Sequence, residues 1–463
     1  MEKTVIQRIN DNIDAHSKGD PEAVSLFLED CGLVTVPEEL TELVWIEYLS
    51  LNNNNISDIH KLEKLSNLNF LELNNNHISD LRGFDILERV EYLHLMNNQI
   101  KNLNELGNLP NLQFLALSNN QIVDIPELNN IPKIDWIFLN NNHIKSIGGV
   151  ANLTSLSWLD FSDNQISDIR QFEKLQNLKE LSLNNNQIYD LSGIEKLTNL
   201  ERLELRKNNL RDIRKINRLT KLELLDISHN EISDINGIEK LKQLESLGLN
   251  NNNIRNIHGI EKLSRLRAID LSDNKISNSN TLALLIELQY VNLNNNLISD
   301  IPRIAYRPNI QNLHLSNNLI DEPLRINSLY KLDNENNLQE LDLSNNKICN
   351  ISFLQDFKNL QSLNLSGNII RDLRGIENLI NLKKLNLSNN RINYIGQIKD
   401  MLNLTDLNLS NNQIRYLRGI ENLFNLRNLN LSNNHINQLY RLENLKNIIK
   451  LDLFNNPIAN NSH

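Results

Sequence analysis

A single 22-residue pattern recurs along almost the whole of this 463-residue chain. Its first full copy contains Leu49-Ser-Leu51-Asn-Asn-Asn54-Asn-Ile56, and the asparagine at the position of Asn54 returns in every later copy. The spacing is 22 throughout except for one step of 28, from Asn318 to Asn346. A chain filled by such repeats predicts a solenoid, in which each repeat packs only on its two neighbours.

The spacing of apolar residues within a repeat predicts its backbone. Leu49 and Leu51 are two positions apart, so both point inward from one face of a β-strand, and stacked repeats would pair these strands in parallel. The repeated asparagine is expected to form a buried ladder that binds inward-turned backbone groups, because a buried amide needs partners. The return half, residues 59–68, is apolar at every third position, which favours 3-10 or short helical turns. Gly149 and Gly193 share one place just before that half, where the chain must bend.

The repeats closely resemble the leucine-rich-repeat (LRR) superfamily, and specifically its short 22-residue class. Residues 188–200, Ile-Tyr-Asp-Leu-Ser-Gly-Ile-Glu-Lys-Leu-Thr-Asn-Leu, carry the pattern of that class, which includes the internalins and the LRR regulatory subunit of protein phosphatase 1. The resemblance implies an α/β repeat solenoid. It would form a curved horseshoe with a parallel β-sheet on the concave face and short helical turns on the convex face.

We predict two parts, an N-terminal capping helix in residues 1–22 and a repeat domain in residues 23–463. Thr4 and Gln7 are spaced as a capping box, and Val5, Ile6, Ile9 and Ile13 are expected on one side of the helix, covering the first apolar layer. A degenerate repeat follows, with Cys31 in the place of the asparagine. The six extra residues within 319–337 predict a loop on the convex side.

Composition and motifs exclude several classes of function. A net charge of −10 disfavours nucleic acid and anionic membranes as main partners, and no apolar run approaches the roughly 20 residues of a membrane span. The sequence has no phosphate-binding glycine motif and no zinc-ligand spacing. We therefore predict no catalytic residues, no metal, no cofactor and no enzymatic activity. The polar N-terminus lacks a signal peptide, which predicts a cytoplasmic protein; non-classical secretion as an effector stays open.

One outward-facing column of the predicted sheet is aromatic. The residue before the middle leucine is aromatic in six successive repeats, although aromatic residues make up only 5% of the chain, and Phe138 widens the column. Two interpretations stay open: a ladder of rings that supports the sheet, or a strip that binds a partner. We adopt the second, with the two tryptophans as anchors. The column consists of Tyr48, Phe70, Tyr92, Phe114, Trp136 and Trp158.

Charge is distributed unevenly over the same predicted face. Acidic residues exceed basic ones at the outward strand positions of the first eleven repeats, whereas the later repeats are balanced. This pattern predicts a partner with a basic or mixed basic and apolar surface. In the later repeats Asn364, Asn386, Asn408 and Asn430 share one column, which we expect to be a structural amide ladder. The acidic site candidates are Asp160, Glu180, Glu204, Asp226 and Asp270.

The leading functional hypothesis is a monomeric, non-enzymatic scaffold that binds a protein partner on the concave face of its N-terminal half. Three alternatives stay open. The protein could be a bacterial effector or virulence-type adaptor acting on a host protein, or a regulatory subunit of a phosphatase or other enzyme. It could also be a structural module that self-associates through its C-terminal edge.

Overall fold

A computed structural model describes residues 4–84, 86–321 and 337–458. It divides into two compact units, Met1–Glu231 (unit 1) and Ile232–His463 (unit 2), and each is described by itself. Most of the loop predicted within 319–337 lies outside the described residues.

The described residues of unit 1 contain one α-helix and ten short strands, and successive strands from β1 to β10 pair in parallel. The helix is α1 (Val5–Ser17), and the strands are β1 (Ser25–Phe27), β2 (Tyr48–Ser50), β3 (Phe70–Glu72), β4 (Tyr92–His94), β5 (Phe114–Ala116), β6 (Trp136–Phe138), β7 (Trp158–Asp160), β8 (Glu180–Ser182), β9 (Arg202–Glu204) and β10 (Leu224–Asp226). The 3-10 helices of this unit are η1 (Pro21–Val24), η2 (Glu38–Glu42), η3 (His60–Lys64), η4 (Gly148–Val150), η5 (Arg170–Lys174), η6 (Ile194–Lys196) and η7 (Arg214–Arg218).

Unit 2 repeats this design with ten parallel strands. They are β11 (Ser246–Gly248), β12 (Ala268–Asp270), β13 (Tyr290–Asn292), β14 (Asn312–His314), β15 (Glu340–Asp342), β16 (Ser362–Asn364), β17 (Lys384–Asn386), β18 (Asp406–Asn408), β19 (Asn428–Asn430) and β20 (Lys450–Asp452). Its 3-10 helices are η8 (Ile238–Lys240), η9 (Ile260–Lys262), η10 (Asn280–Leu284), η11 (Arg303–Tyr306), η12 (Ser352–Asp356), η13 (Gly396–Ile398) and η14 (Tyr440–Leu442).

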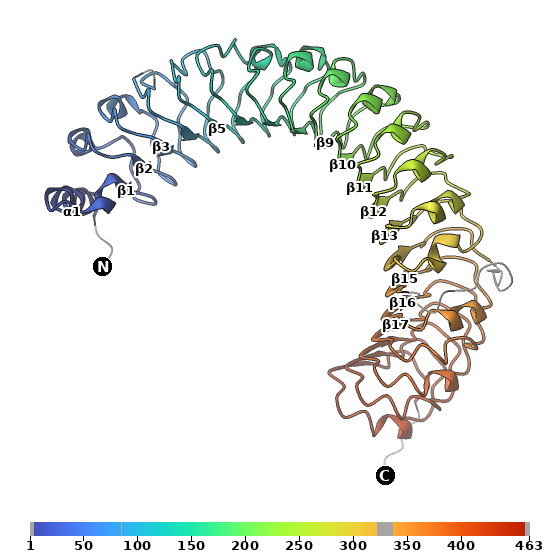
Figure 1. The fold of residues 1–463 in the computed structure, drawn as a ribbon. Helices are drawn as coiled ribbons and strands as arrows, with labels where there is room; N and C mark the ends of the chain where they lie inside the picture. The colour runs from blue at the N-terminus through green and yellow to red at the C-terminus, as the bar shows by residue number, and fades with distance from the viewer. Residues whose placement is uncertain (1–3, 85, 322–336, 459–463) are drawn as a thin grey trace. The chain divides into compact units, whose positions relative to one another are not determined.

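The two sides of each repeat carry different structure, as the spacing predicts. Within unit 1, the strands line the inner side of the curve and the 3-10 helices lie on the outer side (Figure 1). Leu49 and Leu51 are fully buried, and so are Leu62, Leu65 and Leu68 of the return half at no more than 1% exposure. The predicted parallel sheet on a concave face, with 3-10 turns behind it, is confirmed.

The repeated asparagines are buried and bonded to the backbone of two coils. Asn186 Nδ2 donates to the carbonyl oxygens of Phe161 (2.9 Å), Leu183 (3.2 Å) and Asn184 (3.2 Å), while its Oδ1 accepts from the Ile166 amide at 2.9 Å. Every polar atom of the side chain therefore has a partner, which confirms the predicted buried ladder. At the degenerate repeat, the Cys31 amide donates to Asn54 Oδ1 at 3.1 Å.

The residue before each buried asparagine has a left-handed backbone conformation. This conformation was not predicted from the sequence. Asn53 has φ of 58°, and asparagine is among the few residues that tolerate this region. Its side chain also belongs to a second, exposed ladder, since Asn75 Nδ2 donates to Asn53 Oδ1 at 2.7 Å. Among the bend glycines, Gly193 has φ of 98°, and an added Cβ would lie 2.8 Å from Arg170 O. Gly149 does not share this left-handed backbone; a Cβ there would meet Ile125 and Pro126 O.

Helix α1 covers the first layer of unit 1. The predicted capping box is present, because Thr4 N donates to Gln7 Oε1 at 2.8 Å and Gln7 N donates to Thr4 Oγ1 at 3.3 Å. Ile9 is buried, but Ile6 is 44% exposed, so its predicted place on the covered side is wrong. Buried Asn12 adds a polar contact, since its Nδ2 donates to Ser25 O of β1 at 3.0 Å. The domain boundary at residue 22 stays a prediction.

No helix among residues 4–84, 86–321 and 337–458 is long and apolar enough to span a bilayer. The cytoplasmic location inferred from the sequence stays a prediction. Both cysteines, Cys31 and Cys349, are free thiols.

Candidate functional site

The predicted aromatic column forms a continuous row of rings on unit 1. Strand register sets Tyr48 beside Phe70, and each later ring beside the next, as far as Trp136 beside Trp158. Centroids of successive rings along the column are 4.8, 5.3, 6.3, 6.1 and 5.4 Å apart. The structure therefore brings together all six residues that the column predicted.

A second row of rings, two residues further along the strands, interlocks with the first. Phe27 lies 5.2 Å from Tyr48 between ring centroids, His94 lies 4.6 Å from Phe114, and Phe138 lies 5.0 Å from Trp158. Phe138 was assigned to this surface from the sequence, whereas Phe27 and His94 were not. We call the combined surface the aromatic strip; it comprises Phe27, Tyr48, Phe70, Tyr92, His94, Phe114, Trp136, Phe138 and Trp158.

The strip is ordered by its own contacts and still accessible. Trp136 is 40% exposed and Phe27 is 50% exposed, while the other members are half-buried. The planes of Trp136 and Trp158 meet at 65°, an edge-to-face contact that aromatic pairs prefer. The surface is thus a set of rings already fixed in position, which lowers the entropy cost of binding.

Burial shifts the pKa values of two members of the strip, Tyr48 and His94, towards the neutral form. It raises the pKa of Tyr48 to about 12, with a further contribution from the neighbouring Glu72 carboxylate. It lowers the pKa of His94 below the ordinary histidine value, although Glu72 acts in the opposite direction. Near neutral pH the side chains of Tyr48 and His94 are therefore uncharged.

Two glutamates on the strands of unit 1 are held by local donors. Glu72 Oε2 accepts from Ser50 Oγ at 2.9 Å and from Asn52 Nδ2 at 2.6 Å. Glu204 is held in the same way by Ser182 Oγ (3.2 Å) and Asn184 Nδ2 (2.7 Å). These acceptors are fixed in place instead of swinging freely in solvent.

Asp160 and Asp226 are held by the backbone of their own strand ends. Asp160 Oδ1 accepts from the Ser162 amide at 2.8 Å, and Asp226 Oδ1 accepts from the Ser228 amide at 2.9 Å. Burial raises the pKa of Asp160, although the hydrogen bonds from Ser162 oppose that shift.

Two of the predicted acidic residues, Glu180 and Asp270, differ from this group. Glu180 forms an ion pair with Arg202 on the next strand, with Oε2 3.7 Å from Nε, so a cation partly offsets its charge. Asp270 belongs to unit 2, where it accepts from the Ser272 amide at 2.9 Å. The candidate site on unit 1 therefore does not include Asp270.

Family models of the leucine-rich repeat match most of the regions described so far. A model of two consecutive repeats matches residues 44–85, 88–130, 154–196, 176–218, 198–240, 220–263 and 336–378, which together are more than half of the chain. A model of a single repeat matches residues 381–401. The chain belongs to the leucine-rich-repeat family.

Solved LRR structures resemble this LRR protein over most of its length. The ectodomain of the Arabidopsis thaliana receptor kinase GASSHO1/SCHENGEN3, solved with CASPARIAN STRIP INTEGRITY FACTOR 2, is 25% identical, with a TM-score of 0.72 over 91% of this chain and 54% of that one. This chain thus spans about half the length of that ectodomain. An internalin of Listeria monocytogenes is 25% identical, with a TM-score of 0.52 over 86% of this chain and 90% of that one.

YopM of Yersinia enterocolitica shares the fold at 22% identity, with a TM-score of 0.70 over 98% of this chain and 90% of that one. The predicted likeness to internalins is confirmed by the Listeria structure. No curated protein sequence matches this chain.

The asparagine column of unit 2 is not the amide ladder that we expected. Asn386 Oδ1 accepts from both the amide (3.1 Å) and the Oγ (2.8 Å) of Ser388, and Asn364, Asn408 and Asn430 do the same with the serine two residues on. A backbone N–H can only donate, so each amide oxygen faces its own serine and each NH₂ group faces away. Within residues 337–458, no hydrogen bond joins two of these amides. They line a concave hollow of about 550 Å³.

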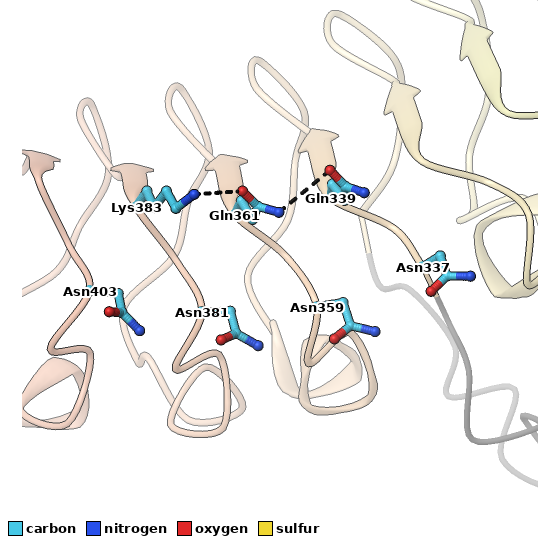
Figure 2. A pocket seen from close by; sticks show the side chains of 7 residues that line it. All are labelled: Asn337, Gln339, Asn359, Gln361, Asn381, Lys383 and Asn403. Atoms are coloured by element: carbon cyan, nitrogen blue, oxygen red, sulfur yellow. Dashed lines mark hydrogen bonds between the residues drawn. The ribbon is translucent and has the colours of Figure 1, made fainter.

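A second hollow, of about 410 Å³, lies on the flank of unit 2 (Figure 2). Gln339, Gln361 and Lys383 form one row along it, in which Lys383 Nζ donates to Gln361 Oε1 at 3.0 Å. Asparagines form the other row; Asn381 Nδ2, for example, donates to Lys358 O at 3.0 Å. Amides and one lysine side chain provide binding groups but no nucleophile with an orienting base.

In the part of the chain that the structure describes, no three His, Cys, Asp or Glu side chains lie close enough to hold a metal ion. The site on unit 1 consists of rings and fixed carboxylates, which are groups suited to binding.

Proposed function

We propose that this LRR protein is a non-enzymatic scaffold whose unit 1 binds a protein partner on its concave face through the aromatic strip. The observation that carries the proposal is the strip itself: nine rings in mutual contact, with Trp136 40% exposed. Accessible aromatic surfaces of this extent are typical of interfaces, and tryptophan is enriched among residues that dominate binding energy.

The charge around the strip favours a partner with basic and apolar side chains. Glu47, Glu91 and Asp135 stand at the beginnings of strands on one side of the rings, and Glu72 and Asp160 stand on the other side. A lysine or arginine side chain over the strip could contact a ring face and a carboxylate together. Opposite charges would also accelerate association at low ionic strength.

The likeness to other LRR proteins supports a protein or peptide as the ligand class. The Arabidopsis ectodomain was solved in complex with CASPARIAN STRIP INTEGRITY FACTOR 2, and another solved structure of this fold is a plant peptide hormone receptor, RGFR1, in complex with RGF2. For this chain we propose the class of ligand only, and no particular ligand.

The proposal is tested by capturing partners with the full chain and with a Trp136→Ala/Trp158→Ala double variant. We expect the double variant to weaken binding of a captured partner at least about 30-fold, equivalent to roughly 2 kcal/mol, because central aromatic anchors typically cost that much. Tyr416→Ala is the matched control, since it removes an exposed ring (65%) from unit 2. A lower melting temperature with unchanged affinity would instead mean that the rings only support the sheet.

Three narrower roles are compatible with this scaffold. A bacterial effector or adaptor and a regulatory subunit of a phosphatase or other enzyme would both use the strip, and the identity of the captured partner distinguishes them. Self-association is favoured by one observation: Leu451 of β20 is 42% exposed, whereas Leu407 and Leu429 at the same position are 2% exposed. We expect a monomer in sedimentation equilibrium; a concentration-dependent dimer that Leu451→Ser abolishes would favour self-association.

A further inference from the structure

Three successive repeats of unit 2 expose a large apolar side chain at the same place on the flank. Ile380, Leu402 and Phe424 are 53%, 51% and 53% exposed. Elsewhere this position holds mainly small, polar, charged or proline residues, such as Ser66, Glu88, Pro132, Thr154, Gln176 and Lys242, and two other large apolar residues at it, Val44 and Ile286, stand alone. We call Ile380, Leu402 and Phe424 the flank ridge.

The backbone of the ridge is fixed, so its exposure is built into the fold. The side chains of Asn403, Asn425 and Asn447 donate to the carbonyl oxygens of Ile380 (2.9 Å), Leu402 (2.7 Å) and Phe424 (2.7 Å). Each ridge residue lies between two core positions that are already filled; Leu379 and Leu382, for example, are fully buried on either side of Ile380. The ridge side chains therefore cannot turn inward without displacing the core.

Four exposed cations surround the ridge. Lys358 and Lys446 occupy the same position in the repeats before and after it, while Lys383 and Arg427 stand at nearby strand beginnings. None of the four forms an ion pair among the described residues. Acidic residues also stand within three positions of this place in their repeats: Asp356, Glu377, Asp400 and Glu421. Glu377 accepts from the Gly375 amide, and Glu421 pairs with Arg441. Lys383 and Arg427 line the hollow beside the ridge, and none of the described residues that line it is a carboxylate. The flank thus places cations next to apolar surface.

Two hollows run beside the ridge and would receive the edge of a ligand. Figure 2 shows the first, where Lys383 ends one row of side chains and Asn381 and Asn403 lie in the row opposite. The second, of about 540 Å³, is lined by Lys383, Arg427 and the 80% exposed Ile449, together with amides of the same asparagine row. The surface is therefore furrowed and carries polar donors along its whole length.

We propose that the flank ridge docks an acidic amphipathic helical segment of a partner protein. The outer members of the ridge are two strands apart, or about 10 Å at roughly 4.8 Å per strand. Apolar residues at i, i+3 or i+4, and i+7 of a helix span about 10.5 Å, so three of them match the three ridge residues. Carboxylates beside this apolar stripe would meet the four cations. The site is independent of the aromatic strip, whose surroundings are acidic and which would repel such a segment.

The proposal is tested with a fluorescent helical peptide that carries leucine at i, i+3 and i+7 and glutamate at its other positions. Its affinity for the full chain is measured by anisotropy, beside a second peptide in which lysine replaces every glutamate. We expect the glutamate peptide to bind and Leu402→Ser/Phe424→Ser to weaken it at least about tenfold. We expect Lys383→Gln/Arg427→Gln to weaken it most at low salt, because screening is then smallest.

Two matched variants make the result specific. Ile286→Ser removes a 62% exposed side chain from the same position in a repeat without a ridge, and it should leave the affinity unchanged. Trp136→Ala/Trp158→Ala should also leave it unchanged, so failure here and failure of the proposed function are distinguishable. The proposal is overturned if the glutamate peptide does not bind, if the lysine peptide binds as tightly, or if Ile286→Ser causes the same loss. Binding to vesicles of equal phosphatidylserine and phosphatidylcholine with the same residue dependence would overturn it in favour of a lipid surface.

Discussion

The concave faces of the two units are built on the same scaffold and carry different chemistry. In unit 1 the position before the middle strand leucine holds rings that contact one another, from Tyr48 to Trp158. In unit 2 the same position holds mostly small, polar or charged residues, and the ring contact on this face joins Tyr290 to His314 at 5.5 Å. Two residues further on, Phe138 and His94 of unit 1 correspond to asparagines such as Asn386 of unit 2.

The comparison separates what specifies the fold from what specifies the ligand. Inward strand positions and the buried asparagine are nearly invariant in both units, because each must satisfy the neighbouring coil. Outward positions are free of that constraint, so one unit can expose neutral rings and the other a row of amide donors. The binding chemistry of the protein therefore lies in columns of outward residues.

The largest expected effect concerns the shared scaffold. Asn186 in unit 1 and Asn390 in unit 2 each make three donor bonds and one acceptor bond to the backbone. Replacing either by alanine leaves buried backbone groups unpaired, at roughly 1–3 kcal/mol for each group that finds no water. We expect both variants to lose at least about 3 kcal/mol of unfolding free energy in urea, and by similar amounts. A loss of unfolding free energy in only one of the two variants would show that the cores of the two units are not equivalent.

A smaller effect is expected where the backbone is left-handed. Asn53 of unit 1 has φ of 58°, and the same position in unit 2 is Gly367 with φ of 68°. We expect Asn53→Ala to cost about 1 kcal/mol and Asn53→Gly to cost less, because alanine is disfavoured in this region and glycine is not.

The corresponding substitution in unit 2 is at Gly367, where the backbone is also left-handed. Gly367→Ala should cost more than Asn53→Ala, because its new Cβ would also meet Asn345 Oδ1. Urea midpoints of the three variants check the order. Equal stability of Asn53→Ala and the unchanged protein would mean that the turn relaxes out of the left-handed region.

The sequence could predict those features that depend on periodicity alone. Register follows from the 22-residue step, so the contacts of Tyr48 through Trp158 and the burial of Asn186 were both accessible from the sequence. Phe27 was hidden because it lies in the degenerate repeat, where the pattern that sets the register is weakest. Phe27 could have been recognised from its position: it follows Leu26, which aligns with Leu49, and therefore faces outward.

Features that depend on competition between partners could not be predicted. Asn386 could bond to the next asparagine of its column or to Ser388, and the periodic pattern permits both. Asn386 bonds to Ser388, because the Ser388 amide lies two residues away and needs an acceptor. The stacking of His94 on Phe70 and Phe114 could not be predicted either, because it depends on the directions of side chains from neighbouring strands.

The smallest expected effect is a pH dependence that the rings of unit 1 confer through His94. Burial between Phe70 and Phe114 lowers the pKa of His94, so the unfolded chain takes up this proton more readily than the folded one. The contribution of neutral His94 to stability is therefore present above the ordinary histidine pKa of about 6.5 and is lost as the pH falls below it. His94→Phe keeps a ring and removes the titration, so its stability should fall less between pH of about 7.5 and about 5.5 than that of the unchanged protein. Protonation would also place a positive charge within the strip and repel a basic partner, so acid should weaken partner binding in the unchanged protein more than in His94→Phe. Urea midpoints and partner affinity at both pH values check the two halves; equal pH dependence in the two proteins would show that His94 is not the titrating group.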